Sequence, residues 1–530
     1  MRELNADIAI IGGGVGGVAA ALAACAAGKN VVMTDPYAWI GGQLTSQAVP
    51  PDEHPWIETH GSTRRYRRYR ELVRSHYRHF YPLTAAARAE PHLNPGGGWV
   101  SALCHEPSVA HAVLCAMLRP YETAGRLVVL RETRPIAATT ERRRVVSVEC
   151  RHNSGEVFVL TAPYFLEASE TGDLIDLAQI AHRSGTESRS DTGEPSAPDV
   201  GDPSDMQAAT MVMALDHIEG DNTIERPVDY DHWRTSRPKD WPNPLLDWRY
   251  PNPRTLAPVT PRFRPNFPAD HESHEDALRV PDLWSYRRII SRTNFEPGFF
   301  QSDVTLVNWP MNDYLEGAVY GVPDADDHIR RAGQLSLSLL YWLQSEAPRP
   351  DGGQGYPGLR LRPDITGSAT GLAQAPYIRE GRRIRALTTV REQDIAVAQR
   401  DGNALHYDNS VGVGAYRIDL HPTIGGANYL DVAALPFEIP LGALIPQDVT
   451  NVIAAGKTLG TTHITNGCYR VHPSEWSIGE AAGTLASYCL DSRHAPKDVW
   501  NSQARTAELQ VRLVTGGSDL AWSANERLAQ

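Results

Sequence analysis

Apolar residues near the start of the chain form two short runs with a longer, alanine-rich run between them. Ile8 to Ile11 and Val31 to Met33 are continuous apolar runs, and residues 15–27 form a nearly uninterrupted apolar segment. Short apolar runs bounded by turn residues are typical of buried strands, whereas the longer run favours a buried helix. The pattern therefore predicts a strand, a helix and a second strand.

The same stretch could in principle cross a membrane, because residues 8–27 are almost all apolar. Five glycines between Gly12 and Gly17 would interrupt such a helix, and no charged flanks or aromatic anchors surround it. We therefore favour the strand–helix–strand unit.

Residues 63–81 combine arginines with aromatic side chains, a mixture that also occurs in RNA-binding segments. The aromatic and apolar positions recur every three or four residues, which predicts an amphipathic helix with the arginines on its other faces. The expected packing face consists of Tyr66, Tyr69, Val73, Tyr77 and Phe80.

Other patterned segments extend along the chain. Glu106 and Pro107 mark the first turn of a helix, since proline is favoured there. Further expected strands lie at residues 127–130, 145–149, 164–166, 210–215, 411–422 and 452–455, a helix at residues 328–343, and a polar loop after residue 456 that leads to a helix beginning near Ser477.

Composition narrows the class of protein. A net charge of -12 argues against nucleic-acid and membrane partners, which usually need a basic surface. The six cysteines show no C-x-x-C spacing, so we expect free thiols rather than disulfides or a metal site. The first strand begins within seven residues, which leaves no room for a signal peptide, and we expect a cytoplasmic protein.

A glycine-rich turn follows the first strand. Gly12, Gly14 and Gly17 have the spacing G-x-G-x-x-G, and Asp35 lies at the end of the second strand, eighteen positions after the last glycine. Such glycines let the backbone approach a pyrophosphate at a helix N-terminus, and the acid can accept hydrogen bonds from a ribose. These elements in register predict a dinucleotide site.

Five segments together resemble FAD-dependent oxidoreductases with a glutathione-reductase-like FAD-binding fold. They are G-G-x-x-T-S at residues 41–46, R-E-x-R-R-I at residues 379–384 with Gly381 where the family commonly has Ser, A-A-G-K at residues 454–457, H-x(6)-R at residues 463–470, and G-E-A-A-G at residues 479–483. The arrangement T-H-x-x-N-x-x-x-R at residues 462–470 is also similar to that of fumarate-reductase-like flavoproteins, in which a His and an Arg of this loop meet the substrate. The resemblance covers the flavin-binding part of the chain well and residues 183–350 poorly.

The resemblance implies FAD as the cofactor. It is expected to lie between the N-terminal turn and the C-terminal helix, whose small residues could approach the flavin ring. The expected cofactor-binding residues are Gly12, Gly14, Gly16, Gly17, Asp35, Gly42, Gln43, Thr45, Arg134, Ser169, Asp173, Gly456, Gly479, Glu480 and Ala481.

Candidate catalytic residues are two histidines and one arginine. His463 or His54 could act as a base, since imidazole exchanges protons near neutral pH, and Arg470 could contact flavin or substrate; simple loop structure is the alternative for all three. Candidate substrate-binding residues are Asn312, Tyr314, Arg379 and Asn466. Arg379 could equally hold an internal carboxylate such as Glu380. No metal site is expected.

The sequence predicts an enzyme with a small-molecule substrate. It contains one dinucleotide turn, no second one for NAD(P)H and no strand-G-D motif of aromatic hydroxylases, so the substrate itself is the simplest source of electrons. We therefore expect an oxidase or dehydrogenase that takes a hydride from a small polar organic molecule. The alternatives are a monooxygenase reduced by transiently bound NAD(P)H and an inactive FAD-binding protein.

The predicted fold class is α/β, with an FAD-binding three-layer ββα Rossmann-like domain and an interleaved substrate domain of mixed sheet and helices. Residues from Arg183 to about Pro350 lack long periodic helices and are rich in Pro and Trp, which suits a substrate domain. The expected boundaries are 1–182 and 446–495 for the FAD domain, 183–350 for the substrate domain, 351–445 for a mixed return segment and 496–530 for a helical tail.

Overall fold

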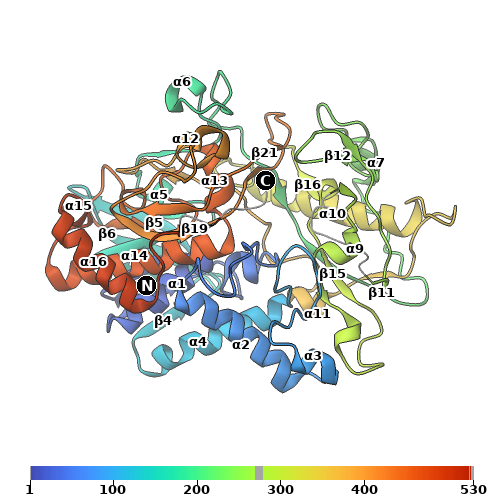
Figure 1. Ribbon diagram of the computed structural model, residues 1–530, viewed down its shortest axis with the longest axis horizontal. Coiled ribbons are helices and arrows are strands. Elements are labelled where there is room, and N and C mark those ends of the chain that lie inside the picture. The colour runs from blue at the N-terminus through green and yellow to red at the C-terminus, as the bar shows by residue number, and fades with distance from the viewer. Residues whose placement is uncertain (1, 269–278, 524–525, 527–530) are drawn as a thin grey trace.

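The computed structural model describes residues 2–268, 279–523 and 526. Figure 1 shows the blue N-terminal and red C-terminal segments together on the left, and the green to yellow middle of the chain on the right. The first of these regions is called the flavin half and the second the substrate half, after the expectations above.

A five-stranded parallel sheet forms the centre of the flavin half. Its strand order is β23-β8-β2-β3-β4, with β2 (Ile8–Ile11), β3 (Val31–Thr34), β4 (Leu127–Leu130), β8 (Tyr164–Glu167) and β23 (Val452–Ala454). The central strand β2 is fully buried and is followed by helix α1 (Val15–Ala26). The predicted strand–helix–strand unit and the α/β class are confirmed.

Helix α14 (His472–Ser492) packs along α1. A Cβ atom at Gly479 would lie 2.1 Å from the carbonyl oxygen of Gly16, and one at Gly483 would lie 2.4 Å from that of Ala20. Because no side chain fits between these backbones, the small residues of the G-E-A-A-G segment allow the two helices to approach closely.

A second sheet covers one side of the flavin half. Strands β7 (Val157–Thr161), β6 (Arg144–His152) and β5 (Thr133–Glu141) are antiparallel, and β1 (Arg2–Asn5) pairs in parallel with β7. The sequence prediction missed β5, whose residues are mostly half-buried or exposed and show little apolar patterning. Helix α5 (Asp173–Leu177) follows β8.

Helix α2 (Arg64–Phe80) confirms the prediction for residues 63–81 and is capped by Thr63. Four of the five expected apolar positions are buried, but Phe80 is exposed at the end of the helix. Arg70 and Arg74 are also buried, because Arg70 pairs with Glu53 and both arginines pair with Glu58. The expectation that the arginines lie away from the packing face is therefore wrong for these two, which are buried in ion pairs.

The substrate half contains a four-stranded antiparallel sheet and one long helix. The sheet order is β14-β15-β11-β17, with β14 (Arg288–Ile290), β15 (Val304–Val307), β11 (Met213–His217) and β17 (Leu359–Leu361), and the helix is α10 (Ala325–Ser345). Residues 210–215 were expected as one strand, but β10 (Ala209–Thr210) and β11 belong to different sheets.

Further helices and short strands connect these elements. They are η1 (Gly42–Leu44), α3 (Ala85–Ala89), α4 (Pro107–Thr123), β9 (His182–Arg183), α6 (Arg189–Thr192), α7 (Tyr230–Thr235), β12 (Tyr250–Pro251), β13 (Pro258–Val259), α9 (Leu283–Tyr286), η2 (Arg292–Asn294), η3 (Pro310–Asn312), β16 (Asp313–Tyr314), α11 (Pro363–Thr366), β18 (Arg383–Ile384), α12 (Glu392–Ile395), η4 (Val397–Gln399), β21 (Leu430–Val432), η5 (Leu441–Leu444), α15 (Pro496–Trp500) and α16 (Gln503–Gly516).

Three predictions near the C-terminus are wrong in detail. Residues 411–422 form two strands, β19 (Ser410–Gly414) paired with β22 (Phe437–Pro440), and β20 (Ile418–Leu420) paired with β21. The expected polar loop contains helix α13 (His463–Tyr469), which Thr462 caps. Helix α14 begins at His472 rather than near Ser477, with Pro473 in its first turn.

The domain boundaries given above stay a prediction. All six cysteines are free thiols, as expected, and five of them are buried. No helix within the described residues is long and apolar enough to span a bilayer.

Candidate active site

The glycine turn after β2 and the loop after β3 lie directly against each other. The amide of Gly41 donates a hydrogen bond to the carbonyl oxygen of Gly13 (2.7 Å). A Cβ atom at Gly42 would lie 3.0 Å from the Cα of Gly14, and Gly12 has a φ of +106° that other residues rarely adopt. The sequence motifs at residues 12–17 and 41–46 thus form one backbone surface, which we call the cradle.

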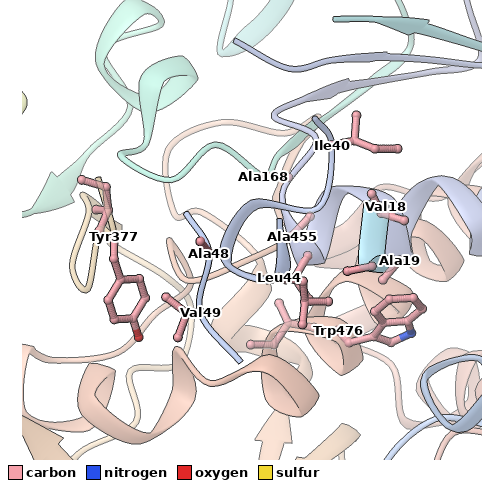
Figure 2. Close-up of a cluster of buried hydrophobic side chains, with 14 of the residues drawn as sticks. Val18, Ala19, Ile40, Leu44, Ala48, Val49, Ala168, Tyr377, Ala455 and Trp476 are labelled. Carbon is pink, nitrogen blue, oxygen red and sulfur yellow. The ribbon is translucent and has the colours of Figure 1, made fainter. Parts of the chain in front are cut away.

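Apolar side chains form the wall of this cradle. Figure 2 shows Leu44, Ala48 and Val49 of the loop between Trp476 of α14 and Tyr377, with Ala168 and Ala455 at nearby strand ends. The backbone of Ala455 lies so close to the turn that a Cβ atom at Gly16 would be 1.9 Å from its carbonyl oxygen. The N-terminal and C-terminal strands of the flavin half therefore meet at the cradle.

Asp35 follows β3 and is buried beside the glycine turn. Its carboxylate accepts a hydrogen bond from the amide of Tyr37 (2.8 Å), and a Cβ atom at Gly13 would lie 2.7 Å from it. Burial raises the pKa of Asp35 to about 8, although the amides of Tyr37 and Gly13 oppose the shift. The position suits the predicted contact with a ribose.

Glu170 and Lys457 form an ion pair at the cradle that the sequence analysis missed. The Glu170 carboxylate would lie 2.6 Å from a Cβ atom at Gly14 and 2.5 Å from one at Gly42. The Lys457 ammonium lies against Oε2 of Glu170 and also donates to the carbonyl oxygen of Ile378 (2.7 Å), while Oε1 of Glu170 has no hydrogen-bond partner among the described residues. A carboxylate and an ammonium therefore lie where phosphate oxygens would approach α1.

Gln43 links the cradle to the start of α14. Its side-chain amide donates to the Glu475 carboxylate and to the carbonyl oxygen of Arg470 (3.0 Å), and its Oε1 has no hydrogen-bond partner among the described residues. Burial, opposed by Lys457 and reinforced by Glu170, raises the pKa of Glu475 to about 7. Glu475 is therefore a second acid beside the cradle, after Asp35, whose pKa is raised into the neutral range.

The other predicted cofactor residues fall into two groups. Thr45, Ser169, Asp173 and Gly456 lie on the loop and at the strand ends around the cradle, and Ser169 Oγ accepts from the amide of Asp173 (2.7 Å). Arg134, on β5, lies close enough to Asp173 to lower its pKa, which burial raises.

The second group, Gly479, Glu480 and Ala481, lies inside α14 rather than at its start, because the helix begins earlier than expected. Gly479 contacts α1, as described above. Glu480 accepts hydrogen bonds from Thr63 (2.6 Å) and Arg65 (2.7 Å), which anchor α2. These three residues are two turns from the helix N-terminus, so their arrangement favours helix packing over contact with a flavin ring.

His463 pairs with Glu380 inside the protein. Its Nδ1 lies 3.0 Å from both carboxylate oxygens, and Glu380 also pairs with Arg383. Burial lowers the pKa of His463, but the Glu380 carboxylate outweighs it and the pKa is raised. The imidazole is thus held in one orientation by a carboxylate, as in many catalytic bases.

His54, the other proposed base, lies in different surroundings. Its Nε2 contacts the carbonyl oxygen of Gly61 (3.0 Å), and its ring packs against Trp56 and Trp522. Burial lowers the pKa of His54 to about 4, which makes it a weak base at neutral pH. These contacts favour a structural role.

Arg470 belongs to a buried cluster of charged and phenolic groups from both halves. Its guanidinium donates to the Tyr377 hydroxyl (2.7 Å) and to the carbonyl oxygen of Asp419 (2.9 Å). The amide of Asp52 donates to Nδ1 of His472 (3.0 Å), and Asp52 forms a long ion pair with Arg287 (3.9 Å). Asp52 and Arg287 were not among the predicted site residues, since only the folded chain brings them to Arg470.

The proposed substrate residues mostly bind other parts of the protein. Asn312 donates to Met211, Val307 and Ser336 and accepts from Trp309. The hydroxyl of Tyr314 bonds to His328 (2.6 Å).

Arg379 and Asn466 complete the predicted set. Arg379 pairs with Asp313 (3.0 Å), so its internal carboxylate is not Glu380. Asn466, on α13, has a buried Oδ1 without a hydrogen-bond partner among the described residues. Of the four predicted substrate residues, Asn466 is therefore the one whose side-chain oxygen has no hydrogen-bond partner among the described residues and can accept a hydrogen bond from a ligand.

The cradle meets the main requirements of a bound dinucleotide. The glycine turn brings backbone to the N-terminus of α1, Asp35 lies beside this turn, as the predicted ribose contact requires, and Lys457 places a positive charge nearby that suits a diphosphate. The carboxylates of Glu170 and Glu475 oppose an anionic ligand, and Lys457 partly balances their charge. Within the described residues no group of three or more His, Cys, Asp or Glu side chains is arranged to hold a metal ion.

Comparison with known families gives a match over most of the chain. A model of the family described as "FAD dependent oxidoreductase" matches residues 7–513. No curated protein matches the sequence.

Three solved structures show distant likenesses to the chain. OxyS anhydrotetracycline hydroxylase from Streptomyces rimosus is 10% identical with a TM-score of 0.36, covering 97% of this chain and 69% of its own. A geranylgeranyl bacteriochlorophyll reductase-like protein from Thermoplasma acidophilum is 9% identical with a TM-score of 0.35, covering 97% and 88%. An L-proline dehydrogenase from P. horikoshii is 13% identical with a TM-score of 0.18, and the match spans only 35% of this chain and 24% of that protein.

Proposed function

The chain belongs to the FAD-dependent oxidoreductases, and from that premise we propose that it oxidises a small polar organic substrate which itself reduces the flavin. The family and the cradle identify FAD as the cofactor. When bound, FAD supplies an acceptor for two electrons, while the protein supplies binding, orientation and proton transfer.

The observation that carries this proposal is the buried His463–Glu380 pair. A base that removes a substrate proton works best when its pKa lies near the working pH, and Glu380 raises the pKa of His463 against the effect of burial. Glu380 also fixes which ring nitrogen faces the carboxylate, which leaves Nε2 of His463 to accept a proton.

Two further residues would position the substrate. Arg470 follows α13, the helix that His463 begins, and its guanidinium is held against Tyr377. The orphaned Oδ1 of Asn466 lies on the same helix. A polar substrate that reached α13 would find a base, a cation and an acceptor along one short segment.

Anaerobic mixing tests the source of the electrons. Loss of the visible flavin absorption on adding an alcohol, amine or hydroxy acid, without NADH or NADPH, supports the proposal. Loss only with NADH or NADPH would favour a monooxygenase and overturn it. If neither kind of reductant bleaches the flavin, the protein is an FAD-stabilised binder.

A further inference from the structure

Two buried arginines from different halves of the molecule have unused hydrogen-bond donors. Arg287 lies between α9 and β14 in the substrate half, and Arg470 follows α13 in the flavin half. Nε and Nη1 of Arg287 and Nε of Arg470 have no hydrogen-bond acceptor among the described residues. Buried donors without acceptors are costly, so such groups generally have a partner that completes them.

The neighbouring residue, Arg288, provides a comparison for Arg287. Arg288 donates from Nε to the carbonyl oxygen of Gly96 (2.7 Å), from Nη1 to Asp303 (3.0 Å) and from Nη2 to the carbonyl oxygen of Gly97 (3.2 Å). Within the described part of the chain, Arg287, one position earlier, donates one hydrogen bond, a long one from Nη2 to the hydroxyl of Tyr286 (3.5 Å). The fold therefore gives each nitrogen of Arg288 an acceptor, whereas two nitrogens of Arg287 have none among the described residues.

Both incomplete arginines lie near the same three groups. Asp52, Tyr377 and Tyr416 each interact electrostatically with Arg287 and with Arg470. Asp52 Oδ1 is 3.9 Å from Nη1 of Arg287, too far for a hydrogen bond, and has no hydrogen-bond partner among the described residues. The arginines thus border one shared polar site between the two halves.

From this arrangement we propose that the substrate carries a carboxylate that binds between the guanidinium groups of Arg287 and Arg470. This inference rests on the proposed function, because it assigns a substrate class to the same site. A carboxylate has two oxygens that accept hydrogen bonds from guanidinium N–H groups in planar geometry. The unpaired donors lie on three nitrogen atoms, Nε and Nη1 of Arg287 and Nε of Arg470, and can reach the two oxygens of one carboxylate.

A groove at the surface of the substrate half supports the approach of an anion. It has a volume of about 270 Å³ and is lined by residues that include Trp241, Arg237 and Lys239. The two cations are exposed and form no ion pair among the described residues. Trp241 stacks on Tyr429 (6.3 Å between centroids), which packs against His421, a neighbour of Asp52. Glu316 also lines the groove and pairs with Arg331, so Arg237 and Lys239 are the groove cations that can attract an anion.

Binding of simple acids and their amides to the FAD-loaded protein tests the proposal. The probes are benzoate, phenylacetate and succinate, compared with benzamide, phenylacetamide and succinamide, and with phenyl phosphate. Binding is followed by the change in the flavin spectrum and by titration calorimetry. At least one acid is expected to bind about 10- to 100-fold more tightly than its amide, since hydrogen bonds to a charged group are the stronger ones.

Variants of the arginines locate the binding. R287Q and R470Q are each expected to weaken binding of that acid by about 10- to 100-fold, with partial recovery in R287K, which keeps the charge but loses the planar fork. R234Q, which breaks an exposed ion pair with Glu346 in the same half, is the matched control and should bind the acid as wild type does. FAD content and the unfolding temperature of each variant show whether it is folded.

Acids binding no better than amides, or unchanged binding in folded R287Q and R470Q, would overturn the proposal. If phenyl phosphate binds more tightly than every acid, the substrate group bound by the arginines is a phosphate and the carboxylate proposal is wrong. A different result would refute the proposed function but not the carboxylate site: acids bind through both arginines, but no organic substrate bleaches the flavin. If an uncharged substrate bleaches the flavin, and R287Q does not change the rate of bleaching, the proposed function stands and the proposed carboxylate site is refuted.

Discussion

The cradle and the arginine site differ in how they are built. Backbone makes the cradle, and most of it comes from two neighbouring sequence segments, the turn at residues 12–17 and the loop at residues 41–46. Side chains make the arginine site, and they come from four segments far apart in sequence, at Asp52, Arg287, Tyr377 and Arg470. A site of the first kind can be found in a sequence as a motif, whereas one of the second kind exists only in the folded chain.

The largest expected effect breaks the cradle at Gly16. G16A places a Cβ atom 1.9 Å from the carbonyl oxygen of Ala455, a backbone atom that cannot move aside without shifting β23. We expect a loss of stability of about 3 kcal/mol and little bound FAD. The measurements are the ratio of FAD to protein after purification and the free energy of unfolding.

Gly333 provides the control for this substitution. A Cβ atom at this position in α10 would lie 3.5 Å from the nearest side-chain atom, an ordinary contact. Alanine also favours helices by about 1 kcal/mol over glycine, so G333A should retain FAD and be equally or more stable. If G16A also retained both properties, the cradle would not be as tightly packed as described.

Comparing the two histidines sharpens the assignment of the base. H463Q should slow reduction of the flavin by the substrate by about 10²- to 10⁴-fold, the usual contribution of a general base. H54Q should have a much smaller effect, because His54 packs among tryptophans and its low pKa makes it a weak base. Rapid-mixing absorbance measures both rates, and a larger loss in H54Q would reverse the assignment.

Glu380 makes the assignment of His463 testable by pH. A base must be unprotonated, so the rate should rise with pH through the pKa of His463. E380Q removes the carboxylate that raises this pKa, and the rise should therefore occur at lower pH. A profile that does not move in E380Q would contradict the role of the pair.

The ion pair at the cradle gives a smaller effect. E170Q should bind FAD about 10-fold more tightly than wild type, because a negative charge beside the diphosphate is removed and Lys457 is freed to pair with it. K457Q should bind FAD more weakly, and E346Q in the substrate half should leave FAD affinity unchanged. Equilibrium titration of the FAD-free protein measures all three; tighter binding in K457Q would contradict the charges described.

Three buried acids predict a gradual dependence of stability on pH. Burial raises the pKa of Asp35 and of Glu167 to about 8, and that of Glu475 to about 7. The folded protein therefore holds protons that the unfolded chain has already released, and the stability of the FAD-free protein should fall as pH rises from about 4 to 8. Thermal unfolding across this range should show a smaller fall for E475Q between pH 5 and 7; an identical slope would remove Glu475 from the account.

Local sequence patterns predicted the cradle but not the residue at which α14 begins. The glycine motif, both adjoining strands and Asp35 could be read from the sequence because their geometry depends on neighbouring residues. The start of α14 was misplaced by five residues, although Pro473 gives the usual signal of a first helical turn. Glu480 was consequently assigned to the cofactor, whereas it binds Thr63 and Arg65.

The arginine site shows the limit of this approach. Arg470 could be named from the H-x(6)-R segment, but its counterpart Arg287 has no sequence feature that separates it from Arg288. Only the folded chain shows that each guanidinium nitrogen of Arg288 has a hydrogen-bond acceptor, whereas Nε and Nη1 of Arg287 have none among the described residues. Likewise, Asn312 appeared suited to a ligand by its residue type, yet its side chain is bonded within the substrate half.

The most direct test of this account is a crystal structure of the FAD-loaded protein with 4-bromobenzoate, whose bromine can be located by anomalous scattering. We predict that its carboxylate oxygens lie within about 3.2 Å of both the Arg287 and the Arg470 guanidinium groups. A carboxylate bound elsewhere, or a flavin ring filling the space between the two arginines, would contradict the central claim that the two halves meet to hold a substrate acid.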